Sequence, residues 1–161
     1  MNIALIVLLV AVALVLAFAG RKLGARAAAR YTLRPSLLTR GELAFLETLV
    51  AAKPAGTYLA PKVRLADVFD APRGDRAAFA RISQKHVDFL LIDEGTCRPL
   101  LGIELDDRTH ERADRRERDA VVDRIFASAG LPILHVKAKA GYNFATLTAE
   151  IRDQLQTTAA V

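Results

Sequence analysis

Residues 87–105 read VDFLLIDEGTCRPLLGIEL, and this stretch decides the fold of the chain. Two nearly continuous apolar runs, Val87–Ile92 and Leu100–Leu105, flank the turn-forming residues Asp93–Thr96. Short apolar runs with so few polar breaks are typical of strands covered on both faces. The stretch therefore predicts a hairpin at the centre of a buried sheet.

The sequence on either side predicts the remaining elements of an α/β domain. Thr39 and Glu42 have the spacing of a capping box, which predicts that a helix starts at Arg40. Hydrophobic periodicity and turn residues then predict a helix over 40–52, a strand over 58–69, a short helix over 77–82, a helix over 114–129, a strand over 131–136 and a helix over 144–155. The expected order is α-β-β-β-α-β-α, with the short helix as an addition.

An apolar run of 17 residues, Ile3–Ala19, precedes this domain. As a helix it would extend about 26 Å. Snorkelling by Arg21 and Lys22 would close the remaining gap to a hydrocarbon core of about 30 Å. We therefore expect a transmembrane anchor in residues 1–22 that contacts the lipid bilayer through residues 3–19. The alternative is a cleaved signal peptide with its site near Ala17–Ala19, but the usual basic residues ahead of the run are missing.

The net charge of +5 is concentrated beside the apolar run. From Gly41 onward, 17 basic and 18 acidic residues nearly cancel. The six other basic residues are Arg21, Lys22, Arg26, Arg30, Arg34 and Arg40. We expect them to contact anionic lipid headgroups, with residues 23–36 as a basic juxtamembrane linker. The positive-inside tendency then places residues 37–161 on the cytoplasmic side of the inner membrane.

The composition excludes two classes of stabilising site in the globular part. Cys97 is the single cysteine, so no internal disulfide can form, and no Cys/His cluster has zinc spacing. The balanced charge also argues against a domain that binds nucleic acid over its whole surface. Any contact with nucleic acid must come from a local patch.

Three acidic residues stand in or beside the predicted buried strands. Asp88 interrupts one apolar run, and Glu104 and Asp106 share a face of the other because side chains two apart on a strand point the same way. Pairing of the two strands would bring Asp88 beside them, and three carboxylates together repel one another unless a cation intervenes. Magnesium prefers such oxygen ligands. The alternative is that Asp88 only forms an ion pair with Lys62, Arg64 or Lys85, and that Asp106 and Asp107 cap a turn.

Val87–Phe89, Ile103–Asp107 with His110 after it, Arg118–Asp119 and Gly130–Val136 together resemble the very-short-patch-repair-like branch of the PD-(D/E)xK nuclease superfamily. More closely, the chain resembles the bacterial domain-of-unknown-function-2726 family, whose members often carry a membrane segment ahead of the domain. The likeness covers residues 38–136. It implies a restriction-endonuclease-like αβββαβ core.

The resemblance implies a magnesium-binding role for Asp88 and Glu104, with the Leu105 carbonyl as a further ligand. The superfamily pattern expects a lysine two residues after the second acid, but Asp106 stands there. Asp106 would extend the ligand set. The related proteins also lack that lysine and use a nearby histidine, so His110 is the candidate for proton transfer.

Other residues have supporting roles in this hypothesis. His86 shares a face with Asp88 and is the second choice for proton transfer, whereas His135 is expected to be a hydrogen-bonded core histidine. Arg118 would hold Asp88 or Glu104 in place. A basic patch would contact the phosphates of the substrate, through Lys62, Arg64 and Lys85, with Arg81 beside them.

The leading hypothesis is a membrane-anchored, magnesium-dependent nuclease-like domain that hydrolyses a phosphodiester bond of nucleic acid. The first alternative is a non-catalytic module of the same fold that binds nucleic acid, a nucleotide or a protein at the inner membrane. The missing lysine and the balanced charge favour that alternative. A second alternative is an inner-membrane assembly factor whose acids are purely structural.

Overall fold

The computed structural model describes residues 2–24, 30–106 and 113–159, with the side chains of residues 5, 16–24, 113–119, 158 and 159 left outside the description. It divides the chain into two units, Met1–Pro35 and Ser36–Val161. The first unit contains α1 (Ile3–Gly24). The second contains α2 (Arg40–Ala52), β1 (Thr57–Arg64), the 3-10 turn η1 (Leu65–Asp67), α3 (Arg76–Ser83), β2 (His86–Asp93), β3 (Pro99–Asp106), α4 (Ala113–Ser128), β4 (Ile133–Lys137) and α5 (Phe144–Ala159).

The N-terminal unit corrects the prediction of a membrane anchor. Within the ranges that the structure describes, no helix is both long and apolar enough to cross a membrane. On that description, the transmembrane anchor predicted for residues 1–22 is wrong, and so is the inner-membrane location derived from it.

Helix α2 begins where the capping box predicted. The backbone N–H of Thr39 donates to Glu42 Oε2 at 2.8 Å, and the backbone N–H of Glu42 donates to Thr39 Oγ1 at 3.3 Å. These two bonds satisfy amide groups that the first turn of a helix leaves without partners. They also hold Glu42 in a buried position, only 8% exposed, which matters for the site described below.

The four strands form one sheet in the order β1-β2-β3-β4. β2 is antiparallel to both β1 and β3, which confirms the predicted hairpin, and β4 is parallel to β3. β1 ends at Arg64 instead of the predicted Phe69. The chain turns there because the Leu65 N–H donates to the Lys85 carbonyl and the Leu65 carbonyl accepts the Val68 and Phe69 amides.

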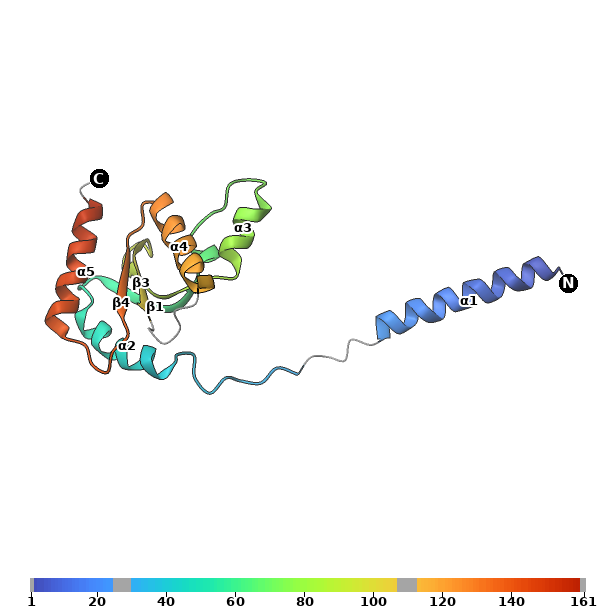
Figure 1. Ribbon diagram of the computed structural model, residues 1–161, viewed down its shortest axis with the longest axis horizontal. Coiled ribbons are helices and arrows are strands. Elements are labelled where there is room, and N and C mark those ends of the chain that lie inside the picture. The colour runs from blue at the N-terminus through green and yellow to red at the C-terminus, as the bar shows by residue number, and fades with distance from the viewer. Residues whose placement is uncertain (1, 25–29, 107–112, 160–161) are drawn as a thin grey trace. The chain divides into compact units, whose positions relative to one another are not determined.

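Helices cover both faces of the sheet (Figure 1). On one face, Phe45 and Leu49 of α2 and Ile151 of α5 pack with Phe89 and Ile103 in a first core cluster. On the other face, a second cluster joins α3 and α4 to the sheet through Ile82, Val122, Phe126, Val87 and Leu90. The mixed α/β architecture is therefore as expected. β2 and β3 lie at its centre, so their polar residues are placed against one helical layer or the other.

Alternation along β3 determines which layer its acids meet. Leu101 and Ile103 belong to the cluster under α2 and α5. Gly102 lies on the opposite face, where the Phe126 ring of α4 packs against it. Glu104 and Asp106 continue the Gly102 face. The two acids thus lie on the α4 side of the sheet, at the C-terminal end of β3, beyond the residues that belong to the hydrophobic core.

Candidate active site

The candidate site lies where β2 and β3 part. The last residues paired between these strands are Phe89 and Ile103. One position beyond this pair, the Leu105 N–H donates to the side chain of Asp88, at 3.0 Å from Oδ2, and not to a backbone carbonyl of β2. A carboxylate thus replaces a backbone partner in the ladder. The strands separate at this point, and their polar residues face a cavity.

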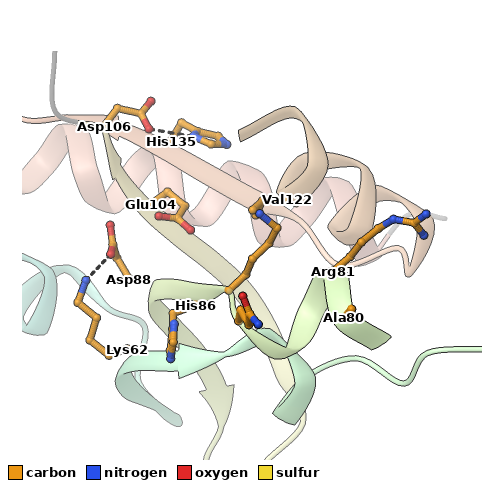
Figure 2. Close-up of a pocket in the computed structure, with 11 residues that line it drawn as sticks. Lys62, Ala80, Arg81, His86, Asp88, Glu104, Asp106, Val122 and His135 are labelled. Carbon is orange, nitrogen blue, oxygen red and sulfur yellow. Dashed lines mark hydrogen bonds and ion pairs between the residues drawn. The ribbon is translucent and has the colours of Figure 1, made fainter. Parts of the chain in front are cut away.

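The cavity has a volume of about 520 Å³ and lies between the sheet end, α3 and α4 (Figure 2). Its lining is strongly polar and contains residues of both charges. Acidic residues come from β2 and β3, basic residues come from β1, α3 and the segment after α3, and β4 adds a histidine. The lining residues are Lys62, Ala80, Arg81, Gln84, Lys85, His86, Asp88, Glu104, Asp106, Val122 and His135.

Asp88 and Glu104 form the central pair of carboxyl groups, and Figure 2 shows them on adjacent strands beside one another. Burial raises the pKa of Glu104 to about 9, together with the charge of Asp88 and a hydrogen bond to it. Burial also opposes ionisation of Asp88, but hydrogen bonds from Lys62 and the Leu105 amide outweigh it and lower its pKa. At neutral pH the pair therefore holds one proton, on Glu104, and one negative charge, on Asp88.

Lys62 reaches this pair from β1. Its Nζ donates to Asp88 Oδ1 at 2.7 Å and to Glu42 Oε1 at 2.5 Å. Burial opposes the charge on Lys62, but the two carboxylates outweigh it and raise its pKa. Of the three ion pairs considered for Asp88 from sequence, the one with Lys62 is therefore present. The Glu42 contact was missed, because the capping-box spacing already gave Glu42 a complete local explanation.

Asp106 has a different neighbour from the one predicted. His135 of β4 lies opposite Glu104 in the parallel register, and its Nδ1 is 3.2 Å from Asp106 Oδ1. Its Nε2 is 2.9 Å from Asp123 Oδ1 on α4. Only an imidazolium can donate from both ring nitrogens. Burial opposes that charge, but the bonds to Asp106 and Asp123 outweigh it and raise the pKa of His135.

His135 is therefore a residue of the cavity wall and not a core histidine. Leu134 and Val136 point into the cluster under α2 and α5, so alternation turns His135 to the opposite face. The same alternation was visible in the sequence. Asp123 had no comparable signal, because α4 contains many charged residues and the sequence does not show which of them face the sheet.

The structure separates the predicted basic patch into residues paired with acids and residues that line the cavity. Lys62 is bound by Glu42 and Asp88, and Arg64 pairs with Asp67, its Nη2 lying 2.6 Å from Asp67 Oδ1. Lys85 lines the cavity, as do Arg81 and His86. The cationic residues available to a bound anion are thus on and just after α3. Arg81 becomes more important than the sequence alone suggested.

Two predicted site residues cannot be placed. His110 lies outside the described residues, and Arg118 belongs to α4 but its side chain is also outside the description. Among the residues described, no group of three or more His, Cys, Asp or Glu side chains is arranged to hold a metal ion. Within the described residues, the carboxyl groups of Asp88 and Glu104 lie close enough together to bind one ion. Magnesium in proteins is often bound by one or two carboxylates and keeps several waters, so this pair is a sufficient donor set.

Comparison with known proteins identifies one family. Residues 34–155 match the family described as "Protein of unknown function (DUF2726)". The matched range includes all four strands and every residue of the cavity wall. No curated protein and no solved structure matches the chain.

Proposed function

This chain belongs to the DUF2726 family of proteins of unknown function, and we propose that it is a magnesium-dependent phosphodiesterase that cleaves nucleic acid. The observation that carries the proposal is the Asp88–Glu104 pair, held together at the point where two strands part. The resemblance of the motifs around these acids to the PD-(D/E)xK nuclease superfamily supports the same reaction.

The pair has the chemistry of a divalent-ion site. Two carboxyl groups in contact normally need a proton or a cation between them, and here the pKa of Glu104, about 9, shows that a proton serves this purpose. A divalent ion can replace that proton and bind both groups as carboxylates. When bound, such an ion stabilises negative charge on phosphate oxygens and lowers the pKa of its water.

The other wall of the cavity supplies the complementary charge. Arg81 and Lys85 line it together with the acids, and each supplies a cation that can bind a phosphate diester. Arginine binds phosphate oxygens through paired N–H groups, whereas lysine acts as a compact charge. We assign substrate binding to this pair, because Lys62 and Arg64 already have acidic partners.

Proton transfer is assigned to His110, as the sequence predicted. His135 is unsuitable for it, since both of its ring nitrogens are bound to carboxylates. The role of His135 is to fix Asp106, whose carboxylate then adds negative charge near Glu104. In this arrangement Asp106 acts through the electrostatic effect of its negative charge on Glu104 and through its bond to His135.

A cleavage assay tests the proposal. The purified full chain is incubated with single- and double-stranded DNA and RNA and with Mg²⁺ or Mn²⁺. Cleavage should depend on the ion and should disappear in Asp88→Asn and Glu104→Gln. Glu150→Gln, which changes an exposed acid of α5, is the matched control and should cleave normally. A wild-type chain that neither cleaves nor gains melting temperature with either ion would exclude the proposal.

One observation favours a second candidate function, a non-catalytic module that binds nucleic acid. Lys62 already compensates Asp88, so the acids can exist without an added ion. Such a module would bind oligonucleotides through Arg81 and Lys85 without cleaving them, and the affinity would not depend on Mg²⁺. The assay above distinguishes the two functions directly.

A further inference from the structure

The backbone of Lys62 is unusual for a residue inside a strand. Its φ angle is +55°, in the left-handed region that residues with a Cβ seldom adopt. It lies between Pro61, paired with Phe89, and Val63, paired with Val87, so the strand continues on both sides. Glycine or asparagine would occupy this conformation more readily. A lysine here therefore needs an explanation in what its side chain does.

The irregular backbone changes the direction of the side chains in β1. Leu59 packs against the core cluster under α2 and α5, whereas Val63 packs against the cluster under α3 and α4. Residues an even number apart on a regular strand share one face, so the facing of β1 changes between them. The left-handed residue, Lys62, lies at this change. Its ammonium consequently reaches Glu42 on one helical layer and Asp88 at the cavity.

Glu42 fixes Lys62 from the side opposite the cavity. Its Oε2 is held by the Thr39 amide, which leaves Oε1 for the lysine ammonium. Asp88 is similarly held at both oxygens, by Lys62 at Oδ1 and by the Leu105 amide at Oδ2. A connected series of bonds thus runs from the start of α2, through β1 and β2, to β3. Its effect is that the Asp88 carboxylate has one orientation, beside Glu104.

We propose that Lys62 is a positioning residue of the active site, which orients Asp88 for the divalent ion from β1, the strand paired with the one that carries Asp88. This inference rests on the proposed function. It gives the site a cationic side chain that position 106, occupied by Asp, does not provide. A lysine that merely neutralised the acids would have the opposite effect on ion binding, because its positive charge repels a divalent cation.

The variant that separates these roles is Lys62→Gly. Glycine accepts the left-handed backbone, so the fold is kept while the ammonium is removed. Mn²⁺ binding to the full chain is measured by electron paramagnetic resonance, together with the melting temperature and, where wild type cleaves, kcat and KM. Arg64→Gln is the matched control, because Arg64 is a cation of the same strand that pairs away from the cavity. Lys62→Asn replaces the glycine variant if that fails to fold, because asparagine adopts this backbone more readily than most residues with a Cβ.

The positioning role predicts that Lys62→Gly binds Mn²⁺ about 10–100-fold more weakly than wild type. Lys62→Arg should recover part of the loss, and added methylammonium should recover part of it in the glycine variant. Unchanged or tighter Mn²⁺ binding by Lys62→Gly would overturn the inference. A wild type that binds Mn²⁺ but cleaves nothing defeats only the proposed function, whereas a wild type that binds no Mn²⁺ defeats both.

Discussion

Gly102 and Phe126 are in such close contact that a Cβ on Gly102 would lie 2.4 Å from Cε1 of the phenylalanine ring. No real Cβ contact is that short, and Phe126 is fully buried and cannot move aside freely. Gly102→Ala should therefore push α4 from β3 and lower the free energy of unfolding by about 1–3 kcal/mol. Urea denaturation followed by circular dichroism measures the loss.

Gly41→Ala is the control for this substitution. Gly41 lies in the first turn of α2, and an added Cβ would meet nothing within 4 Å. Alanine there should leave the stability unchanged or raise it by up to about 1 kcal/mol. An equal effect of both substitutions would show that the Gly102–Phe126 contact does not hold α4 against the sheet.

Glu104 should make the metal-free chain less stable as the pH rises. Its pKa is about 9 in the folded chain against 4.5 as the ordinary value, so between these limits the folded chain binds the extra proton. The free energy of unfolding should then fall by up to about 1.4 kcal/mol per pH unit across this window. In Glu104→Gln the fall should be much smaller. Melting curves from pH 5 to pH 9 give the comparison.

Magnesium should counteract this loss in the wild-type chain. Because the ion replaces the proton on Glu104, its stabilising effect should be larger at pH 8 than at pH 6. Glu104→Gln should gain little melting temperature from Mg²⁺ at either pH. An equal gain in wild type and variant would show that the ion binds elsewhere.

His135 should contribute stability below neutral pH. Its pKa is raised from 6.5 by Asp106 and Asp123, so the contribution is present in full below 6.5 and is lost as the pH rises through the higher folded value. The partners are half exposed, which limits the effect to about 1 kcal/mol. His135→Gln should thus be less stable than wild type at pH 5.5, and the difference should shrink as the pH rises above 6.5, as thermal melts can determine. A difference that is the same at both pH values would contradict the charged pairing.

Arg81 and Lys85 should determine substrate affinity. Replacing each by Gln should raise KM about tenfold or more, since a charge-assisted hydrogen bond contributes roughly 1.5–3 kcal/mol, while kcat changes less. Arg76→Gln is the control, because Arg76 belongs to the same helix but does not line the cavity. Fluorescence anisotropy with a labelled oligonucleotide gives the affinity separately from cleavage. Equal losses in Arg76→Gln would indicate a general effect of charge.

The hairpin of β2 and β3 and the start of α2 were predictable because their causes are local. Val87–Ile92 and Leu100–Leu105 are apolar runs around a turn, and Thr39 with Glu42 marks a helix start by spacing alone. Pairing these two strands also placed Asp88 beside Glu104 in the sequence-based prediction. The end of β1 was not predictable, because it depends on a bond between Leu65 and Lys85, twenty residues away.

The remaining site residues depend on contacts between layers, which single-sequence patterns do not encode. Asp123 reaches His135 from a different helix, and Glu42 reaches Lys62 from the layer on the other side of the sheet. The membrane prediction failed for a different reason. It was drawn from the composition of residues 3–19, whereas the described part of α1 does not provide a span of the required length and apolarity.

β1 lies at the outer edge of the sheet, and its irregular centre limits what else can pair there. Pro61 has no amide hydrogen to donate, and the left-handed Lys62 next to it interrupts the even spacing of donors and acceptors that a further strand would need. Edge-to-edge polymerisation between copies of the chain is therefore disfavoured along this side. Lys62, which contacts Asp88 at the cavity, thus also helps to protect the edge of the sheet against aggregation.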